Sequence, residues 1–276
     1  MSDFDLDRWV ARSGALDLSE VDWDAVPAHP VAPEVVRVLR YMQDIESHTI
    51  VYLRQLLATR AIDDPEVATF LACWFNEETF HGRALDRFLA AAGCPPGPRP
   101  RARSDVGLVA RLEELATRLV SRAWPDFVAV HMLWGAINEL TTLTGYRRLS
   151  AIAGHPVLGD LLGRIIGDES RHFFFYYKQA ERRLAAPRVA RVARLLIERF
   201  WAPVGSGVQP LAELRFLAAT LLAGREGEAA ARKVDATIRR LPGMEGIPLL
   251  GAWLARELPG AGTPVHNAGD LECRTA

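Results

Sequence analysis

Two copies of the motif Glu-x-x-His occur in this chain of 276 residues, one from Glu78 to His81 and the other from Glu169 to His172. Each lies in a stretch whose apolar residues recur with helical spacing. Residues three apart share one face of a helix, so the carboxylate and the imidazole of each motif can reach the same small volume. Because the chain has seven His, about half of one such motif is expected by chance. Two copies therefore indicate metal binding.

A single Glu precedes each motif, in a separate segment with a helical pattern. Glu46 comes before the first motif and Glu139 before the second, at nearly equal intervals, which indicates a duplicated pair of helices. In both motif helices the charged residues interrupt an apolar stripe, and a carboxylate in a core is costly unless a metal or a counter-charge compensates it. One Glu from each of two helices and a Glu-x-x-His from each of two others form the ligand set of a carboxylate-bridged di-metal centre in a four-helix bundle. We therefore predict six metal ligands: Glu46, Glu78, His81, Glu139, Glu169 and His172.

The donor types limit the choice of metal. Four carboxylates and two neutral imidazoles suit a pair of iron ions (Fe2+/Fe3+), or Mn and Fe, better than copper or a structural zinc. Such a pair can deliver two electrons to O2. A purely structural metal is disfavoured, because structural sites prefer closed tetrahedral sets of thiolate and imidazole.

Four long helices must position these ligands. We expect helices at 34–61, at 65–92, from just after Pro125 to about 152 and from 155 to about 185, with a connecting helix near 106–122. Pro65 suits the first turn of a helix, and Gly93 with the Pro-rich stretch behind it ends the second helix. No segment has the alternating pattern of a strand. The sequence therefore predicts an all-α fold, a four-helix bundle with additional C-terminal helices.

We divide the chain into three parts. Residues 1–33 contain three prolines and form an N-terminal arm that we expect to be extended or loosely ordered. Residues 34–257 form a single helical domain, with a metal-binding core at 34–185 and three or four accessory helices at 187–257. Residues 258–276 form a C-terminal tail.

The composition excludes some classes of function. A formal net charge of −1 argues against bulk attraction to nucleic acid or to anionic membranes. The acidic N-terminus has no hydrophobic signal core, and no apolar run approaches the length of a membrane span. We expect a cytoplasmic protein that binds neither nucleic acid nor membrane.

The two motifs and their flanking residues resemble those of a known family. Residues 76–82 read Asn-Glu-Glu-Thr-Phe-His-Gly and look like the Glu-Glu-x-x-His-Gly motif of the soluble acyl-carrier-protein desaturases. Residues 168–172 read Asp-Glu-Ser-Arg-His and look like the Asp-Glu-x-Arg-His motif of the same enzymes. These desaturases belong to the ferritin-like di-iron carboxylate superfamily. The resemblance covers roughly residues 35–185 and implies a ferritin-like four-helix bundle, whereas the C-terminal third has no counterpart that we can place.

The resemblance implies a role for each predicted ligand. Glu78 and Glu169 would bridge two irons. Each iron would be completed by one further Glu and one His: Glu46 with His81, and Glu139 with His172.

Two other residues acquire catalytic roles from the same resemblance. Asp168 would be the hydrogen-bond partner of a ligand histidine. Thr142, one turn beyond Glu139, matches a hydroxyl that the desaturases use near the O2 site. The family also uses a Trp in electron transfer, for which Trp9 and Trp23 are the candidates.

The implied activity is that of an O2-dependent di-iron oxidase that desaturates or hydroxylates an aliphatic substrate. The substrate is either bound to an acyl carrier protein or a free small molecule. The resemblance also implies an electron donor such as a ferredoxin, and a homodimer. Two alternatives remain: a di-iron N-oxygenase or hydroxylase in natural-product biosynthesis, and a non-enzymatic ferritin-like iron-binding protein.

An aliphatic substrate needs an apolar channel that ends at the irons. We expect open volume beside Gly135 and Thr142, which lie one turn on either side of Glu139. The residues expected to line the channel are Met42, Thr49, Trp74, Met132, Gly135, Thr142 and Phe173. An acyl carrier protein is acidic and would dock on an Arg-rich surface such as Arg99, Arg101 and Arg103.

Other polar residues have simpler interpretations. Glu77 is expected to face solvent or a neighbouring Arg. His48 is expected at a cap or at the surface, and His131 is expected to be a hydrogen-bonded core histidine. We expect Tyr146 and Tyr176 to be core aromatics with hydrogen-bonded hydroxyls rather than redox groups.

Overall fold

The computed structural model describes residues 4–94, 121–206 and 208–259, and within these ranges the chain is largely helical. No β-strand occurs in them, and one isolated bridge pairs Ser206 with Gln209. The prediction of an all-α fold is confirmed. Among the described helices, none combines the length and the apolar character that crossing a membrane requires.

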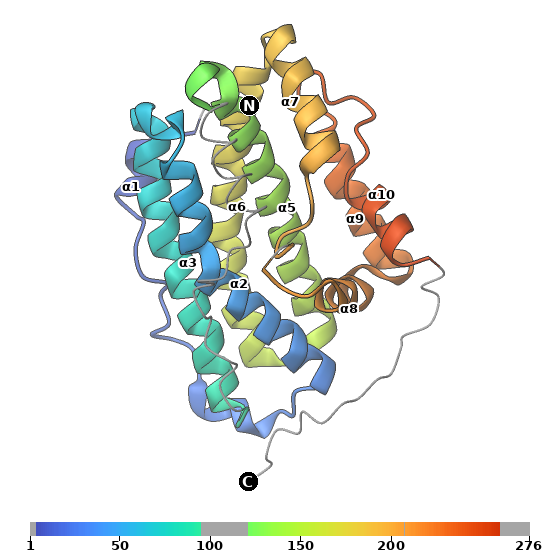
Figure 1. Ribbon diagram of the computed structural model, residues 1–276. Coiled ribbons are helices and arrows are strands. Elements are labelled where there is room, and N and C mark those ends of the chain that lie inside the picture. Colours follow the sequence, from blue (N-terminus) through green and yellow to red (C-terminus); the bar gives the residue numbers. More distant parts are fainter. Residues whose placement is uncertain (1–3, 95–120, 207, 260–276) are drawn as a thin grey trace.

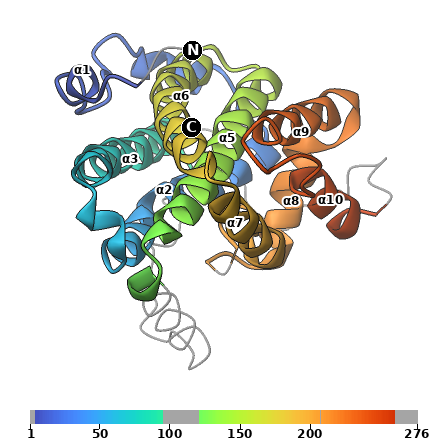
Figure 2. The ribbon, with the colours of Figure 1, turned by 90° about the horizontal axis from the view of Figure 1, so that it is seen from above.

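Four long helices carry the predicted ligands: α2 (Pro33–Leu57), α3 (Pro65–Ala91), α5 (Val128–Ala153) and α6 (Pro156–Leu184). They lie side by side (Figures 1 and 2). α2 packs along α3 and α5 packs along α6, while contacts between α3 and α6 and between α2 and α5 join the two pairs. The two helices that carry the Glu-x-x-His motifs, α3 and α6, are therefore neighbours.

The observed helix ends follow local signals in the sequence. α2 ends at Leu57 and is followed by a 3-10 turn (η2, Arg60–Asp63), so the first helix is shorter than the predicted 34–61. At the start of α3 the Asp64 side chain accepts hydrogen bonds from two backbone N–H groups of the first turn. Gly154 ends α5 with a φ of 61°, a left-handed conformation that glycine adopts without strain. The other predicted ligand helices agree with the structure to within a few residues.

Four accessory helices are described after α6: α7 (Pro187–Phe200), α8 (Leu211–Leu222), α9 (Gly224–Ile238) and α10 (Leu250–Glu257). α5 contacts α7, α8 and α9 in addition to α6 and α2. Its side chains are consequently buried around most of its circumference. In Figure 2 the accessory helices lie on the side of α5 away from α3. α5 is therefore the central helix of the fold.

The N-terminal segment is packed, in contrast to the expectation of an extended or loosely ordered arm. It contains α1 (Leu6–Val10), which contacts α3, and a 3-10 turn (η1, Trp23–Ala28), which contacts α3 and α6. Trp9 and Val26 are buried in the core. Trp9 also stacks on Phe70 of α3, with 4.8 Å between the ring centroids. Apolar side chains in an otherwise polar segment hold it against the ligand helices.

Several expectations fall outside the described residues. The connecting helix expected near 106–122 is described only at its end, where residues 121–123 are helical. Arg99, Arg101 and Arg103, the expected docking surface, lie outside the described ranges, as does most of the C-terminal tail.

Candidate metal centre

The six predicted ligands converge at one place between the four long helices. Two groups of potential ligand atoms meet there, and within each group the atoms lie within 4.8 Å of one another: Glu46, Glu78, His81 and Glu169 in one, and Glu78, Glu139, Glu169 and His172 in the other. Two carboxylates, those of Glu78 and Glu169, belong to both groups. The arrangement offers two adjacent positions for a metal ion, with two carboxylates able to serve both.

The candidate centre is closed off from solvent. His81, His172 and Glu169 are fully buried, and no more than 7% of Glu46, Glu78 or Glu139 is exposed. Removing several carboxylates from water is unfavourable unless positive charge compensates them. The burial therefore requires cations or protons at this place.

Both histidines turn the same ring atom toward the centre. Nε2 of His81 lies 3.1 Å from a carboxylate oxygen of Asp168, and Nε2 of His172 lies 2.7 Å from one of Glu77, each in a hydrogen bond. Nδ1 of each ring then faces the inner carboxylates, at 3.2 Å for His81 and 3.0 Å for His172. A carboxylate on the outer nitrogen fixes the tautomer and the ring orientation, which leaves Nδ1 available to bind a metal.

The inner polar atoms lack hydrogen-bond partners among the described residues. These atoms are Nδ1 of His81, Nδ1 of His172 and both carboxylate oxygens of Glu169. Because buried polar groups in proteins are nearly always paired, unpaired atoms that converge on one place indicate a ligand. A pair of divalent cations fits this donor set, since the donors are oxygens and imidazole nitrogens and the four carboxylates of the two groups balance four positive charges.

Without a metal, protons must compensate the carboxylates. Burial and the neighbouring Glu169 raise the pKa of Glu78 to about 7. Burial and adjacent carboxylates also hold the pKa values of Glu46 and Glu139 well above the usual range. Burial opposes the charging of His81, but the carboxylates beside it raise its pKa to about 9. A metal would therefore compete with protons for these groups.

Glu77 belongs to this centre, contrary to the expectation that it faces solvent or an Arg. Only 2% of Glu77 is exposed, and its carboxylate accepts the hydrogen bond of His172. Asp168 takes the corresponding place beside His81, as the resemblance implied, and Arg171 donates to its other oxygen. Each of these carboxylates directly precedes the Glu of one motif and binds the His of the other. An acidic residue before each motif Glu was the sequence signal that could have identified Glu77.

Tyr146 and Thr142 lie on the same side of the centre as Glu46. The Tyr146 hydroxyl donates a hydrogen bond to the Glu46 carboxylate, which fits the expected core aromatic with a bonded hydroxyl. Thr142, one turn earlier on α5, lines a narrow cavity that also reaches Glu46. The two catalytic candidates, Thr142 and Asp168, thus lie on different sides of the ligands: Thr142 at a cavity and Asp168 behind a histidine.

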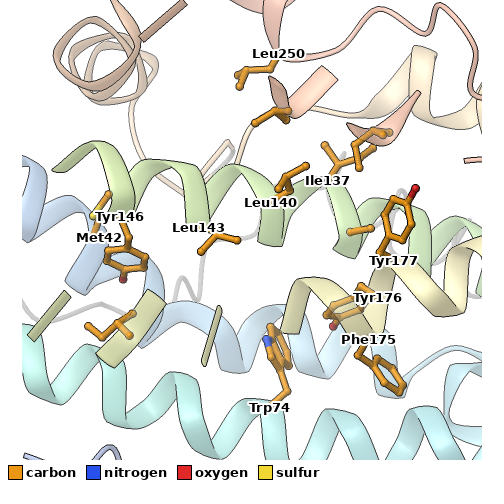
Figure 3. Packing of buried hydrophobic residues seen from close by; sticks show 14 of the residues in the cluster. Met42, Trp74, Ile137, Leu140, Leu143, Tyr146, Phe175, Tyr176, Tyr177 and Leu250 are labelled. Carbon is orange, nitrogen blue, oxygen red and sulfur yellow. The ribbon is translucent and has the colours of Figure 1, made fainter. Parts of the chain in front are cut away.

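The open volume expected beside Gly135 is filled. A Cβ atom at Gly135 would lie 2.3 Å from Cδ1 of the Tyr176 ring, so this glycine lets α6 pack closely on α5. The Tyr176 hydroxyl is buried without a partner in the described part of the chain, as are the Tyr52 hydroxyl and Nε1 of Trp74. The hydrogen bond expected of the Tyr176 hydroxyl is therefore not found among the described residues. Figure 3 shows Trp74 and Tyr176 together, well separated along the core from Tyr146.

The predicted channel is found only in part. Met42 and Thr142 line the cavity that reaches Glu46. Five other predicted residues are not among its lining residues: Thr49, Trp74, Met132, Gly135 and Phe173. The rest of the wall comes from other residues of α2 and α5, from the loop between α7 and α8, and from the accessory helices α8 and α10. The predicted channel did not include these accessory helices.

His48 and His131, the two other histidines considered from the sequence, lie outside the ligand groups. Nδ1 of His48 lies 2.7 Å from the backbone carbonyl oxygen of Asp44, within its own helix. Nε2 of His131 is buried without a hydrogen-bond partner among the described residues, and burial lowers the pKa of His131 to about 4. His131 is thus a neutral, half-buried residue, and it forms no side-chain hydrogen bond among the described residues, unlike the hydrogen-bonded core histidine that was expected.

The two candidate tryptophans differ in their distance from the centre. The Trp9 ring lies edge-on to the His172 ring, with 6.4 Å between centroids. Trp23 instead packs under the guanidinium of Arg87, on the outer side of α3. Trp9 is therefore the tryptophan of the pair that adjoins a predicted ligand.

No protein-family model, curated protein or solved structure matches this chain. The motifs and the geometry of the buried centre therefore carry the functional argument.

Proposed function

We propose that this chain is an O2-dependent di-iron oxidase that resembles the soluble acyl-carrier-protein desaturases. The observation that carries the proposal is the pair of ligand groups that share Glu78 and Glu169. The unpaired Nδ1 atoms of His81 and His172, which face these carboxylates, support it. Iron is the metal we propose because a set rich in carboxylates with two imidazoles suits Fe(II) better than copper or structural zinc.

The proposal includes the identity of the fold. In it, α2, α3, α5 and α6 are the helices of a ferritin-like four-helix bundle, and α7 to α10 are additions to it. The order of the ligands along the chain supports this: a single Glu, a Glu-x-x-His, a single Glu and a Glu-x-x-His on successive long helices. A di-metal centre of this kind needs its ligand helices packed side by side, with the two motif helices in contact. α2 packs on α3, α5 packs on α6, and α3 contacts α6.

Two ferrous ions held by these residues would supply the electrons that activate O2. In the proposed desaturation, the substrate loses two hydrogens from adjacent carbons. O2 takes up these hydrogens together with two electrons and two protons from a donor such as a ferredoxin, which gives an alkene and two waters. Hydroxylation would consume the same two electrons and protons but leave one oxygen atom on the carbon and release one water.

The protein's own groups would prepare the site for this reaction. Asp168 and Glu77 would keep the two histidine rings oriented with Nδ1 inward. The Tyr146 hydroxyl would hold the Glu46 carboxylate in position. The Thr142 side chain would lie where the cavity meets the ligands, within reach of a bound small molecule.

The cavity beside Glu46 favours one reaction class over another. Its lining is almost entirely apolar, as an aliphatic carbon substrate requires. An amine substrate, which an N-oxygenase would bind, would find polar partners only at the end formed by Glu46, Tyr146 and Thr142, and would lose hydration along the rest of the cavity. We therefore rank oxidation of aliphatic carbon above N-oxygenation. The ferredoxin donor, the homodimer and the choice between a free substrate and one carried by acyl carrier protein rest on the resemblance.

Iron loading followed by O2 tests the proposal. Protein loaded anaerobically should bind two Fe(II) per chain, and a single addition of O2 should oxidise both irons. Further O2 consumption should then require an external reductant. A chain that binds one iron or none contradicts the di-iron centre. Aerobic uptake of many irons per chain would instead indicate a non-enzymatic iron store.

A further inference from the structure

A narrow cavity of about 80 Å³ separates part of the ligand helices from the accessory helices. It lies between α2, α5, α8 and α10, and the loop between α7 and α8 closes part of it with Val204. Its inner end is formed by Glu46 and Tyr146. Its outer walls include Ala218 of α8 and Trp253 of α10. The cavity thus links a predicted metal ligand to the part of the chain that has no counterpart in the resemblance.

The hydroxyl groups along the cavity are largely engaged elsewhere. The Tyr41 hydroxyl donates to the backbone carbonyl of Val204 at 2.7 Å. The Thr141 and Thr144 hydroxyls each donate to a carbonyl one turn back in α5, at 2.7 Å in both cases. These side chains therefore present mainly carbon to the cavity. An occupant would meet apolar surface everywhere except at the end formed by Glu46, Tyr146 and Thr142.

The volume limits the size of the occupant. A cavity of about 150 Å³ lined by Leu, Ile and Phe binds benzene, a molecule of six carbons. The present cavity, at about 80 Å³, has roughly half that room. It accommodates about three or four carbons in the same manner of packing. A long acyl chain does not fit between Glu46 and the walls of α8 and α10.

We propose that this cavity binds a short aliphatic group of the substrate, of about three or four carbons, with its innermost carbon beside Glu46. The accessory helices α8 and α10 then set the length of the group that is oxidised. This inference rests on the proposed function for its catalytic meaning. The lining of the cavity consists of protein side chains, so its binding can be measured on the metal-free protein.

Close packing at Gly145 supports the proposal that α8 forms the wall that limits the length of the bound aliphatic group. A Cβ atom at Gly145 would lie 3.3 Å from Cε of Met42 and 3.7 Å from Cδ1 of Leu221. The absence of a side chain there lets α5, α2 and α8 meet around the cavity. Ala218, which is buried and lines the same cavity, is the α8 position where a larger side chain would fill it.

Methionine-methyl NMR of the metal-free protein tests the proposal, because the chain has four Met and Met42 lines the cavity. The probes are straight-chain primary alcohols from 1-propanol to 1-octanol. We expect a saturable shift of the Met42 methyl signal, while Met244, which is buried but does not line the cavity, stays in place. Affinity should rise about fourfold per carbon up to about four carbons and then level off.

Two cavity variants and a matched control complete the test. Ala218→Leu should abolish the Met42 shift, whereas Ala212→Leu, an exposed Ala on the same helix, should leave it unchanged. Leu217→Ala should enlarge the cavity and allow the rise in affinity to continue to longer alcohols. The absence of a saturable Met42 shift in the unchanged protein would overturn the proposal, as would affinity that keeps rising through 1-octanol.

Iron content measured on the same preparations separates this inference from the proposed function. Two irons per chain without alcohol binding would refute the short-chain cavity and leave the oxidase proposal intact. Alcohol binding in a chain that takes up no iron would refute the oxidase and, with it, the substrate role of the cavity.

Discussion

The two halves of the candidate metal centre are alike in their ligands and unlike in their surroundings. In each half a histidine donates Nε2–H to the acidic residue that precedes the Glu of the other motif: His81 to Asp168, and His172 to Glu77. In each half one further Glu completes the group. The shared features are the ones that metal binding needs. The surroundings of the two halves differ, and these differences decide which molecules can reach each metal position.

On the Glu46 side, the surroundings are a bonded hydroxyl and a cavity. Tyr146 donates to Glu46, and the cavity brings apolar surface up to the same carboxylate. On the Glu139 side there is tight aromatic packing. Tyr176 lies against Gly135, and its ring is 6.1 Å from that of Trp74. Access therefore lies on the Glu46 side of the centre, and the Glu139 side is closed by packing.

The largest expected effect concerns what the halves share. Glu78→Ala or Glu169→Ala should remove both irons, because each of these carboxylates belongs to both ligand groups. Glu46→Ala should leave the group around Glu139 intact and so retain close to one iron per chain. Iron per chain after anaerobic loading measures this. Glu34→Ala, which removes an exposed carboxylate from α2, is the control. Loss of both irons in Glu46→Ala would contradict the division into halves.

The next effect tests whether the halves are equivalent at their outer carboxylates. Asp168→Asn and Glu77→Gln should each weaken metal binding about 10- to 100-fold, since each replaces the charged partner of one histidine. Competition with a chromophoric chelator gives the affinities. If Asp168→Asn weakens metal binding strongly and Glu77→Gln does not, the two carboxylates share a position beside a histidine but do not contribute equally to metal binding.

Two glycines of α5 sharpen the contrast between closure and access. In Gly135→Ala the new Cβ would lie 2.3 Å from the rigid Tyr176 ring, so the free energy of unfolding should fall by about 1–3 kcal/mol. In Gly145→Ala the nearest atom, at 3.3 Å, is the flexible end of Met42. That variant should be neutral or gain up to about 1 kcal/mol from helix propensity. Urea unfolding of the metal-free variants measures both values. Equal losses in the free energy of unfolding for the two variants would contradict the contrast between a Gly135 that meets a rigid ring and a Gly145 that meets a flexible side chain.

The smallest effect concerns the two tyrosines. Tyr146→Phe should lower the free energy of unfolding of the metal-free protein by about 1 kcal/mol, because it removes a buried hydrogen bond to Glu46. Tyr176→Phe removes a buried hydroxyl that has no partner among the described residues, so it should be neutral or slightly stabilising. The same unfolding assay applies. Greater destabilisation by Tyr176→Phe would mean that its hydroxyl has a partner, such as an ordered water.

The ligands and their helices were predictable because both depend on short-range patterns. The i, i+3 spacing of each motif, an apolar stripe around it, and start and stop signals such as Pro65 and Gly93 can all be read within one helix. Glu77 was misjudged because its partner, His172, lies on another helix. Its role follows only once α3 and α6 are placed side by side.

The space beside the ligands, at Gly135 and in the cavity, could not be predicted from the sequence. A glycine on an inner helix face is compatible with an open space or with close packing, and only the position of the Tyr176 ring decides between them. Part of the cavity wall comes from α8 and α10, and α8, the nearer of the two in the chain, begins at Leu211, well beyond the end of α5 at Ala153. No periodicity within α5 relates it to those helices. Sequence patterns therefore locate the metal ligands better than they locate the space beside them.

The spacing of the two irons tests the central claim most directly. X-ray absorption spectroscopy of protein loaded with two irons per chain measures the distance between them. Ligand groups that share Glu78 and Glu169 predict an iron–iron distance of about 3.5–4 Å, as in other two-metal sites. Two bound irons with no iron–iron scattering at that distance would contradict the account. A single iron coordinated mainly by imidazole would contradict it as well.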